Sequence, residues 1–139
     1  MQPYSRFQNI VLSLLRFFIA IIFIQAAYAK FGLWIEVPDG MSLGLVYLLR
    51  FTSLAELLGG SALLLGFLTR LAASGLVLVM LGAIAYLQFV VGTGFAGQGG
   101  PGWNFPLALL GGCLALIAFG AGPFSFDAIY SRRKQKNVE

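Results

Sequence analysis

Six polar side chains inside long apolar stretches are the residues of this sequence that could do chemistry. They are Arg16, Gln25, Lys30, Arg50, Glu56 and Gln88. Ionisable groups at membrane depth are costly, and they commonly belong to ion pairs, ligand pockets or proton pathways. Glu56 is the only acid among the six, so any ion pair or proton-carrying site in these stretches must involve it.

Two interpretations of Glu56 compete. In the first, Glu56 forms a structural ion pair that fixes the register of two helices, with Arg16 or Lys30 as its partner. In the second, it is a proton carrier in a polar pocket that holds a quinone or a lipid headgroup. Counted along ideal helices, Arg16 lies about 9 Å and Glu56 about 18 Å from the same membrane edge. An arginine side chain could cover much of that difference, so the sequence favours an Arg16–Glu56 structural pair.

The remaining polar residues extend the list of candidates for a pair or a pocket. Arg50 is expected near the outer membrane edge, where it can pair with Glu36 or Asp39 or extend its charge into water. Gln25 falls on the face of its helix opposite Arg16, and Gln88 falls in the outer half of a later helix. With a single acid, a proton or ion pathway is the weakest of the readings.

The composition indicates an integral membrane protein. The chain has 139 residues, of which 59% are hydrophobic and 10% charged, and no charge occurs between positions 71 and 126. An average soluble domain has about 25% charged residues. The net charge of +4 does not indicate nucleic-acid binding, because four of the nine basic residues lie in the last eight positions. Such a cluster is typical of an anchor to anionic headgroups.

Cysteine and histidine limit the chemistry available to the chain. It contains one cysteine, Cys113, and no histidine. An internal disulfide and a CxxC redox pair are therefore excluded, and the commonest metal and haem ligand is absent. The sequence predicts no metal site and no intrinsic cofactor, and it gives Cys113 a packing role in an apolar helix.

The apolar segments predict an all-α fold, a four-helix transmembrane bundle in a single domain spanning residues 1–139. The expected spans are residues 10–29, 46–68, 71–91 and 105–119, since a spanning helix needs about 20 apolar residues. The fourth is short. The triplet AYA before Lys30 resembles a signal-peptidase site, but Arg16 interrupts the apolar run, so we expect a retained helix.

The loops predict the orientation. Arg6, Arg70 and the basic tail, residues 128–139, fall on one side, and basic residues favour the cytoplasm. We therefore expect a multi-pass protein of a bacterial-type inner membrane with both termini cytoplasmic. Trp34 and Trp103 fall in the two outer loops, where tryptophan favours the headgroup level.

The outer loop GTGFAGQGGPGWN has two readings. As a glycine-rich, uncharged segment it is first a flexible connection. Alternatively it folds over the mouth of the bundle with its backbone near a ligand or partner, which makes Trp103 and Asn104 candidate site residues. Asn104 followed by Pro106 is typical of a helix start. At the other end, GAGPFSFD ends the last helix, after which Ser125 or Asp127 can cap a short turn.

Small residues are expected to join the helices, because lipid tails are as apolar as leucine and burial alone does not drive association. Gly59 and Gly60 would let the first or another helix approach closely. Small-xxx-small faces occur on three of the helices, which leaves homo-oligomer formation open.

Three motifs resemble the DoxX family of small four-helix membrane proteins. They are LLRFFIAIIFIQAAYAK, AELLGGSALLLGFLTRLAA and GAGPFSFD, in the order and spacing found in that family. By this resemblance the family-typical positions are Arg16, Lys30, Glu56, Arg70, Asn104 and Asp127. Many members carry a histidine near the end of the third helix, where this chain has Gln88.

The resemblance implies a redox setting. Some relatives are linked to thiosulfate oxidation with quinone as acceptor, others to membrane oxidoreductase assemblies in oxidative-stress defence. The first expectation is therefore an accessory or anchoring subunit of a membrane oxidoreductase, with quinone as a candidate cofactor and oxidoreductase subunits as partners. The alternative is a stand-alone binder or carrier of a small lipophilic molecule. The sequence leaves open whether the chain is itself an enzyme, and it names no catalytic residue.

Overall fold

The computed structural model describes residues 5–97, 100, 102–122 and 125–128, and these form helices joined by turns and loops, with no strand among them. The elements are α1 (Arg6–Ala29), α2 (Gly32–Ile35), α3 (Leu43–Leu65), α4 (Thr69–Ala85), the π-helical segment η1 (Tyr86–Val91) and α5 (Asn104–Phe119). The prediction of an all-α protein is confirmed. The short α2 was not predicted, and most of the predicted basic tail lies outside the described residues.

Three helical segments are long and apolar enough to cross a membrane: Arg6–Ile35, Leu43–Leu65 and Thr69–Val91. The first two begin earlier than predicted, because serine caps supply the first hydrogen bonds. Ser5 forms a capping box with Gln8, and the hydroxyl of Ser42 accepts a hydrogen bond from the Leu45 N–H. α5, with 16 residues, is apolar but shorter.

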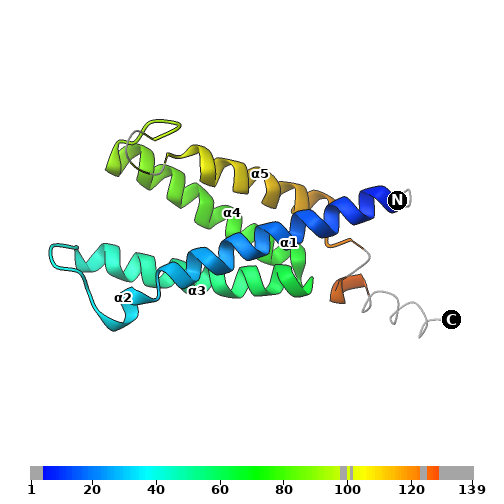
Figure 1. Ribbon diagram of the computed structural model, residues 1–139, viewed down its shortest axis with the longest axis horizontal. Helices are drawn as coiled ribbons and strands as arrows, with labels where there is room; N and C mark the ends of the chain where they lie inside the picture. Colours follow the sequence, from blue (N-terminus) through cyan, green and yellow to red (C-terminus); the bar gives the residue numbers. More distant parts are fainter. Residues whose placement is uncertain (1–4, 98–99, 101, 123–124, 129–139) are drawn as a thin grey trace.

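The four long helices pack around a ring (Figure 1). α1 lies along α3, α3 on α4, and α4 on α5, and α5 returns to α1 over a shorter contact. The pairs α1–α3 and α4–α5 separate toward the end of the molecule where α2 lies. Both described termini, near Ser5 and Ala128, lie at the opposite end.

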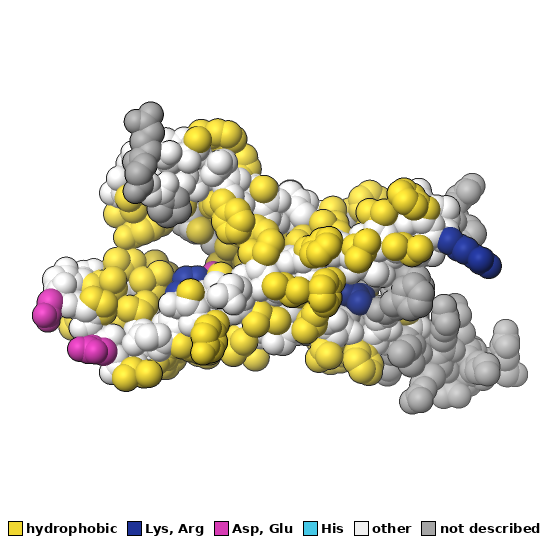
Figure 2. All heavy atoms as spheres, viewed as in Figure 1, with side chains coloured by type: hydrophobic (Ala, Val, Ile, Leu, Met, Phe, Trp, Pro, Cys, Tyr) yellow, Lys and Arg dark blue, Asp and Glu magenta, His cyan; other side chains and the backbone are white. Residues whose placement is uncertain are grey.

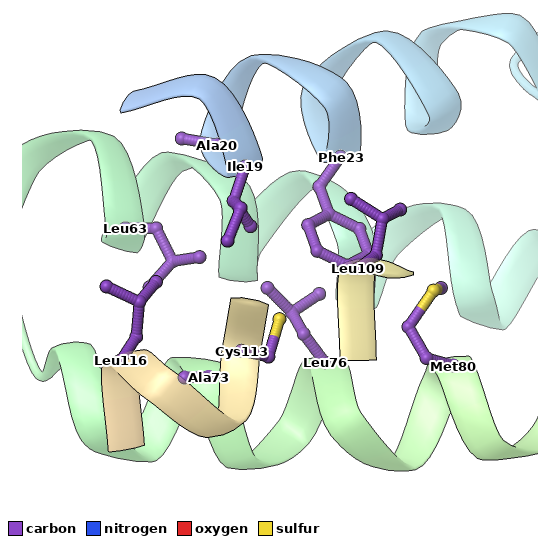
Figure 3. Close-up of a cluster of buried hydrophobic side chains, with 10 residues drawn as sticks. All are labelled: Ile19, Ala20, Phe23, Leu63, Ala73, Leu76, Met80, Leu109, Cys113 and Leu116. Atoms are coloured by element: carbon purple, nitrogen blue, oxygen red, sulfur yellow. The ribbon is translucent and has the colours of Figure 1, made fainter. Parts of the chain in front are cut away.

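The core lies where the four helices meet (Figure 3). Figure 3 shows Phe23 of α1, Leu63 of α3 and Leu76 of α4 turned into one cluster with Cys113 and Leu116 of α5. Cys113 is fully buried there, which confirms its packing role. Leucine and phenylalanine side chains also cover much of the outer surface (Figure 2), as a lipid environment requires.

Small residues make the close helix contacts. A methyl group on Gly60 would lie 3.1 Å from the Ala20 carbonyl oxygen on α1, and one on Gly59 would lie 2.9 Å from the Leu76 side chain on α4. The prediction that this glycine pair permits close approach is confirmed, with one glycine facing each neighbour. Gly75 has nothing within 4 Å of the same position and faces away from the bundle.

Candidate functional site: two polar junctions in the bundle

The buried face of α3 carries polar residues, whereas its exposed face is apolar. The buried positions of α3 include Ser53, Glu56 and Gly60, at helical spacing, whereas Phe51 and Leu58 are exposed. A lipid-facing surface must be apolar, so the costly polar groups are placed against other helices. They gather in two junctions, one toward each end of the bundle.

The first, which we call the Lys30 junction, contains Lys30, Trp34, Arg50, Ser53 and Glu56. Its central contact is a salt bridge of 2.5 Å between Lys30 Nζ and Glu56 Oε2. The Glu56 side chain is 4% exposed and the Lys30 side chain 25% exposed. The pair therefore joins the end of α1 to the middle of α3, with its acid buried and its base partly open.

The end of α1 and the α2 turn bring Lys30 to Glu56. Lys30 is the residue that closes α1, and its backbone N–H donates to the Ala27 and Tyr28 carbonyls. Because Gly60 lets α1 lie close against α3, the end of α1 comes within reach of Glu56, one turn from Gly60. The chain then turns into α2, which packs against α3.

Two further contacts fix α2 on α3. Trp34 Nε1–H donates to the Ser53 hydroxyl at 3.1 Å. The Arg50 guanidinium donates to the Leu33 carbonyl from Nε and from Nη2, at 2.9 and 2.7 Å. Arg50 also lies 5.5 Å from the centre of the Trp34 ring and 5.9 Å from that of Tyr47, distances at which a cation is attracted to an aromatic face.

The second, which we call the Arg16 junction, contains Arg16, Gly66, Ala121, Ser125 and Asp127. The buried Arg16 side chain donates from Nη1 to the Ala121 carbonyl at 2.5 Å. The Asp127 N–H donates to the Gly66 carbonyl at 3.0 Å. The segment after α5 is thereby tied to α1 and to the end of α3.

The Asp127 carboxylate caps α4. Its two oxygens accept from the Leu68 and Thr69 N–H groups at 2.8 and 2.9 Å. A helix leaves its first N–H groups without partners, and a carboxylate there also interacts favourably with the helix dipole. Leu68 has φ +46, in the left-handed region that non-glycine residues rarely adopt, and the carboxylate holds this turn in place.

Gly66 is required where α3 ends. It has φ +67, and a methyl group on it would lie 2.5 Å from Ser125 Cβ and 2.7 Å from Arg16 Nη1. Glycine both supplies the left-handed end of α3 and leaves room for the C-terminal segment. Ser125 accepts from the Ala128 N–H at 3.1 Å, so the predicted cap of the short turn is Ser125, while Asp127 caps α4 instead.

The predicted Arg16–Glu56 pair is wrong. Glu56 binds Lys30, the alternative partner, and Arg16 binds the segment after α5. The depth estimate placed the two residues about 9 Å apart along the membrane normal and let the arginine cover the gap. In the structure Arg16 lies beside Gly66, ten residues farther along α3 than Glu56, which is about 15 Å at 1.5 Å per residue.

The other predicted residues have different positions. For Arg50 the sequence left open a pair with Glu36 or Asp39 or an extension into water; the pairing alternative is wrong, since Arg50 binds the Leu33 carbonyl. Gln25 and Gln88 lie at exposed positions. With Arg16 and Glu56 in different junctions, the four residues do not form one pocket.

The loop before α5 is held by contacts within itself. The Phe95 and Trp103 rings meet edge to face, with centres 4.7 Å apart, and the Asn104 N–H donates to the Phe95 carbonyl at 3.0 Å. The Asn104 side chain accepts from the Phe105 N–H, and α5 begins at Asn104, one residue before the predicted span of residues 105–119. In their described contacts Trp103 and Asn104 stabilise the loop.

Sequence reasoning gave no site role to Trp34, Ser53, Gly66 or Asp127. Gly66 and Asp127 do fall in motifs that carried the family resemblance, which was the available signal for the Arg16 junction. The Trp34–Ser53 contact depends on the unpredicted α2. No group of three or more His, Cys, Asp or Glu residues that could hold a metal ion occurs within the described residues.

A hollow lies beside the Lys30 junction (Figure 2). It separates the α1–α3 pair from the α4–α5 pair, and acidic and basic side chains are visible at its inner end. Its place agrees with the partial exposure of Lys30.

Comparison with known proteins identifies the family. The DoxX family matches residues 11–93, which include α1 from residue 11 onward, the elements α2 to η1 and the whole Lys30 junction. The search of curated proteins gave no match, and the search of solved structures gave none either. Since the matched region is more than half of the 139 residues, this chain belongs to the DoxX family.

Proposed function

We propose that this DoxX protein is a four-span inner-membrane protein that serves as an accessory or anchoring subunit of a membrane oxidoreductase system. Family membership supports the redox setting. The charged side chains within the helices hold the bundle together, and this supports the anchoring role.

α5 completes the bundle as the fourth span. Its 16 residues cover about 24 Å, against a hydrocarbon core of about 30 Å. α5 packs along α4, itself part of a segment long enough to cross, and backbone within hydrocarbon must be hydrogen-bonded internally, as in a helix. An even number of spans places both termini on one side, and the positive-inside rule assigns that side to the cytoplasm.

One observation carries the subunit role: the charged groups inside the bundle hold the fold together. Lys30 and Glu56 join α1 to α3, Arg50 holds α2, and Arg16 holds the segment after α5. A chain built in this way offers a stable apolar surface to partners. In this proposal, a quinone used by the oxidoreductase system is bound by the complex and not by this chain alone.

Affinity purification from native membranes in a mild detergent tests this proposal. We expect redox enzyme subunits to be recovered with the tagged chain and to be absent from an untagged control. The variant Gly75→Leu adds a side chain to the outward face of α4 and clashes with nothing inside the bundle. Loss of a recovered partner, or of a second copy, in this variant would show that this face binds it. Recovery of the chain alone from cross-linked membranes would overturn the subunit role.

A second candidate function is the binding or carriage of a small lipophilic molecule. The partly exposed Lys30, salt-bridged to a buried acid beside the hollow, favours it. Mass spectrometry of organic extracts from the purified protein tests it. A lipid or quinone retained in stoichiometric amount is the expected result, and extracts without any such compound would contradict it.

A further inference from the structure

The hollow beside the Lys30 junction follows from how the helices diverge. The hydrophobic cluster of Figure 3 includes Leu63 of α3 but none of that helix's residues from position 43 to 62, and the buried Val46 lies outside this cluster. On α4 the buried positions end at Met80, and Ile84 of α4 and Leu87 of η1, which follow at helical spacing, are only half-buried. Between the first half of α3 and the last half of α4, the bundle is therefore open.

The Lys30–Glu56 pair has hydrogen-bonding capacity left toward this opening. An ammonium group has three donors, and one of them is used on Glu56 Oε2. A carboxylate has a second oxygen that can accept, and no hydrogen bond within the described residues uses Glu56 Oε1. The partly exposed Lys30 side chain makes the pair accessible.

The charges decide what kind of group suits this site. Lys30 and Glu56 neutralise each other, and the Arg50 guanidinium of the same junction is held by the Leu33 carbonyl. A charged head placed against the Lys30–Glu56 pair would therefore add a charge that the pair does not compensate, which is costly in a low-dielectric environment. An uncharged head that carries both an acceptor and a donor satisfies the ammonium and the carboxylate together. The apolar helix faces around the opening suit a hydrocarbon tail.

We propose that the Lys30–Glu56 pair is the head-binding site for an uncharged amphiphile, a molecule with a hydrocarbon tail and a head bearing a carbonyl acceptor and a hydroxyl donor. This inference rests on the second candidate function and specifies its site and ligand class. The carbonyl accepts from Lys30 Nζ, and the hydroxyl donates to Glu56.

Quenching of Trp34 fluorescence tests the site. The Trp34 indole is hydrogen-bonded to Ser53, one turn from Glu56 on α3, and therefore lies near the proposed head-binding pair. The Trp103→Phe background removes the other tryptophan and keeps an aromatic ring against Phe95. Three probes share one brominated acyl chain: a monoacylglycerol, the free fatty acid as its carboxylate, and the corresponding long-chain amine. We expect saturable quenching by the monoacylglycerol, at a concentration at least about tenfold lower than for either charged probe.

The matched control is the double variant Lys30→Met/Glu56→Met, which replaces the pair by apolar side chains and leaves no unpaired charge. We expect it to fold, as judged by circular dichroism and elution volume, and to lose saturable quenching. Retained quenching in this variant, or tighter binding of a charged probe, would overturn the assignment while leaving a lipid-binding function in place. Absence of saturable quenching by all three probes, together with ligand-free organic extracts, would overturn both. A second polypeptide occupying the hollow, without probe binding, would also overturn the assignment.

Discussion

The two junctions hold the bundle by different chemistry. At the Lys30 junction the central contact joins two side chains, Lys30 and Glu56. At the Arg16 junction the side chains bind backbone groups: Arg16 binds the Ala121 carbonyl, and Asp127 binds the N–H groups of Leu68 and Thr69.

This difference determines which junction can be rebuilt. Two side chains that satisfy each other can be removed together, and no polar group is left behind. A side chain that satisfies the backbone cannot be removed in this way, since the carbonyl or N–H group remains. The Lys30–Glu56 pair is therefore replaceable and suited to ligand binding, whereas the Arg16 junction is a fixed part of the fold.

The largest expected effect is at the Lys30 junction. Lys30→Met leaves Glu56 buried without its partner, and we expect a loss of about 3–5 kcal/mol in unfolding free energy. Unfolding in mixed micelles, followed by circular dichroism, measures it. The double variant Lys30→Met/Glu56→Met should recover most of the loss. Additive losses would show that the two side chains do not act as a pair.

Arg16→Met should cost about 1–3 kcal/mol, because the Ala121 carbonyl loses its donor in a buried position. The same unfolding assay measures this loss. Arg16→Lys is the control, since it keeps the charge and one donor and should recover part of the stability. A loss as small as that of an exposed substitution such as Gln25→Ala would contradict the proposed role of Arg16.

Asp127→Ala should destabilise the protein by about 0.5–2 kcal/mol, the usual range for loss of a helix cap. Asp127→Asn should lose less, since asparagine also caps helices but lacks the charge. Hydrogen exchange of the Leu68 and Thr69 amides gives a local measurement. Unchanged protection of these two amides in Asp127→Ala would contradict the role of Asp127 as the cap of α4.

The smallest effect distinguishes the inner and outer faces of the helices. Gly60→Ala should cost about 1 kcal/mol, because the new methyl group presses on Ala20 and Ile24 of α1. Gly75→Ala should be neutral or slightly stabilising, since nothing lies near it and alanine favours helix. Paired melting temperatures check both. Equal shifts would contradict the close approach of α1 to α3.

Much of the fold could be predicted from the sequence, because a membrane limits the options. The apolar segments, the glycine pair and the turn after α3 follow from local patterns that the structure confirms. The start of α1 was misplaced because the apolar run begins after the cap at Ser5.

The partner of Glu56 could not be predicted, because it depends on how far α1 is shifted along α3. Counting residues from estimated membrane edges places side chains only to within several ångströms. An error of that size is enough to make Arg16, instead of Lys30, the expected partner of Glu56. The role of Asp127 was hidden for a related reason. A cap normally comes from a residue next to its helix, whereas Asp127 lies 58 residues from Thr69.

The 58 residues between Asp127 and Thr69 affect the order in which contacts form during synthesis. Synthesis runs from the N-terminus, so α3 and α4 are complete long before Asp127 leaves the ribosome. Until then the start of α4 lacks its carboxylate, and Arg16, 105 residues before Ala121, lacks the carbonyl that it binds. The Arg16 junction thus closes only after residue 127 has been translated, and in a nascent chain truncated before residue 121 both Arg16 and the start of α4 lack these contacts.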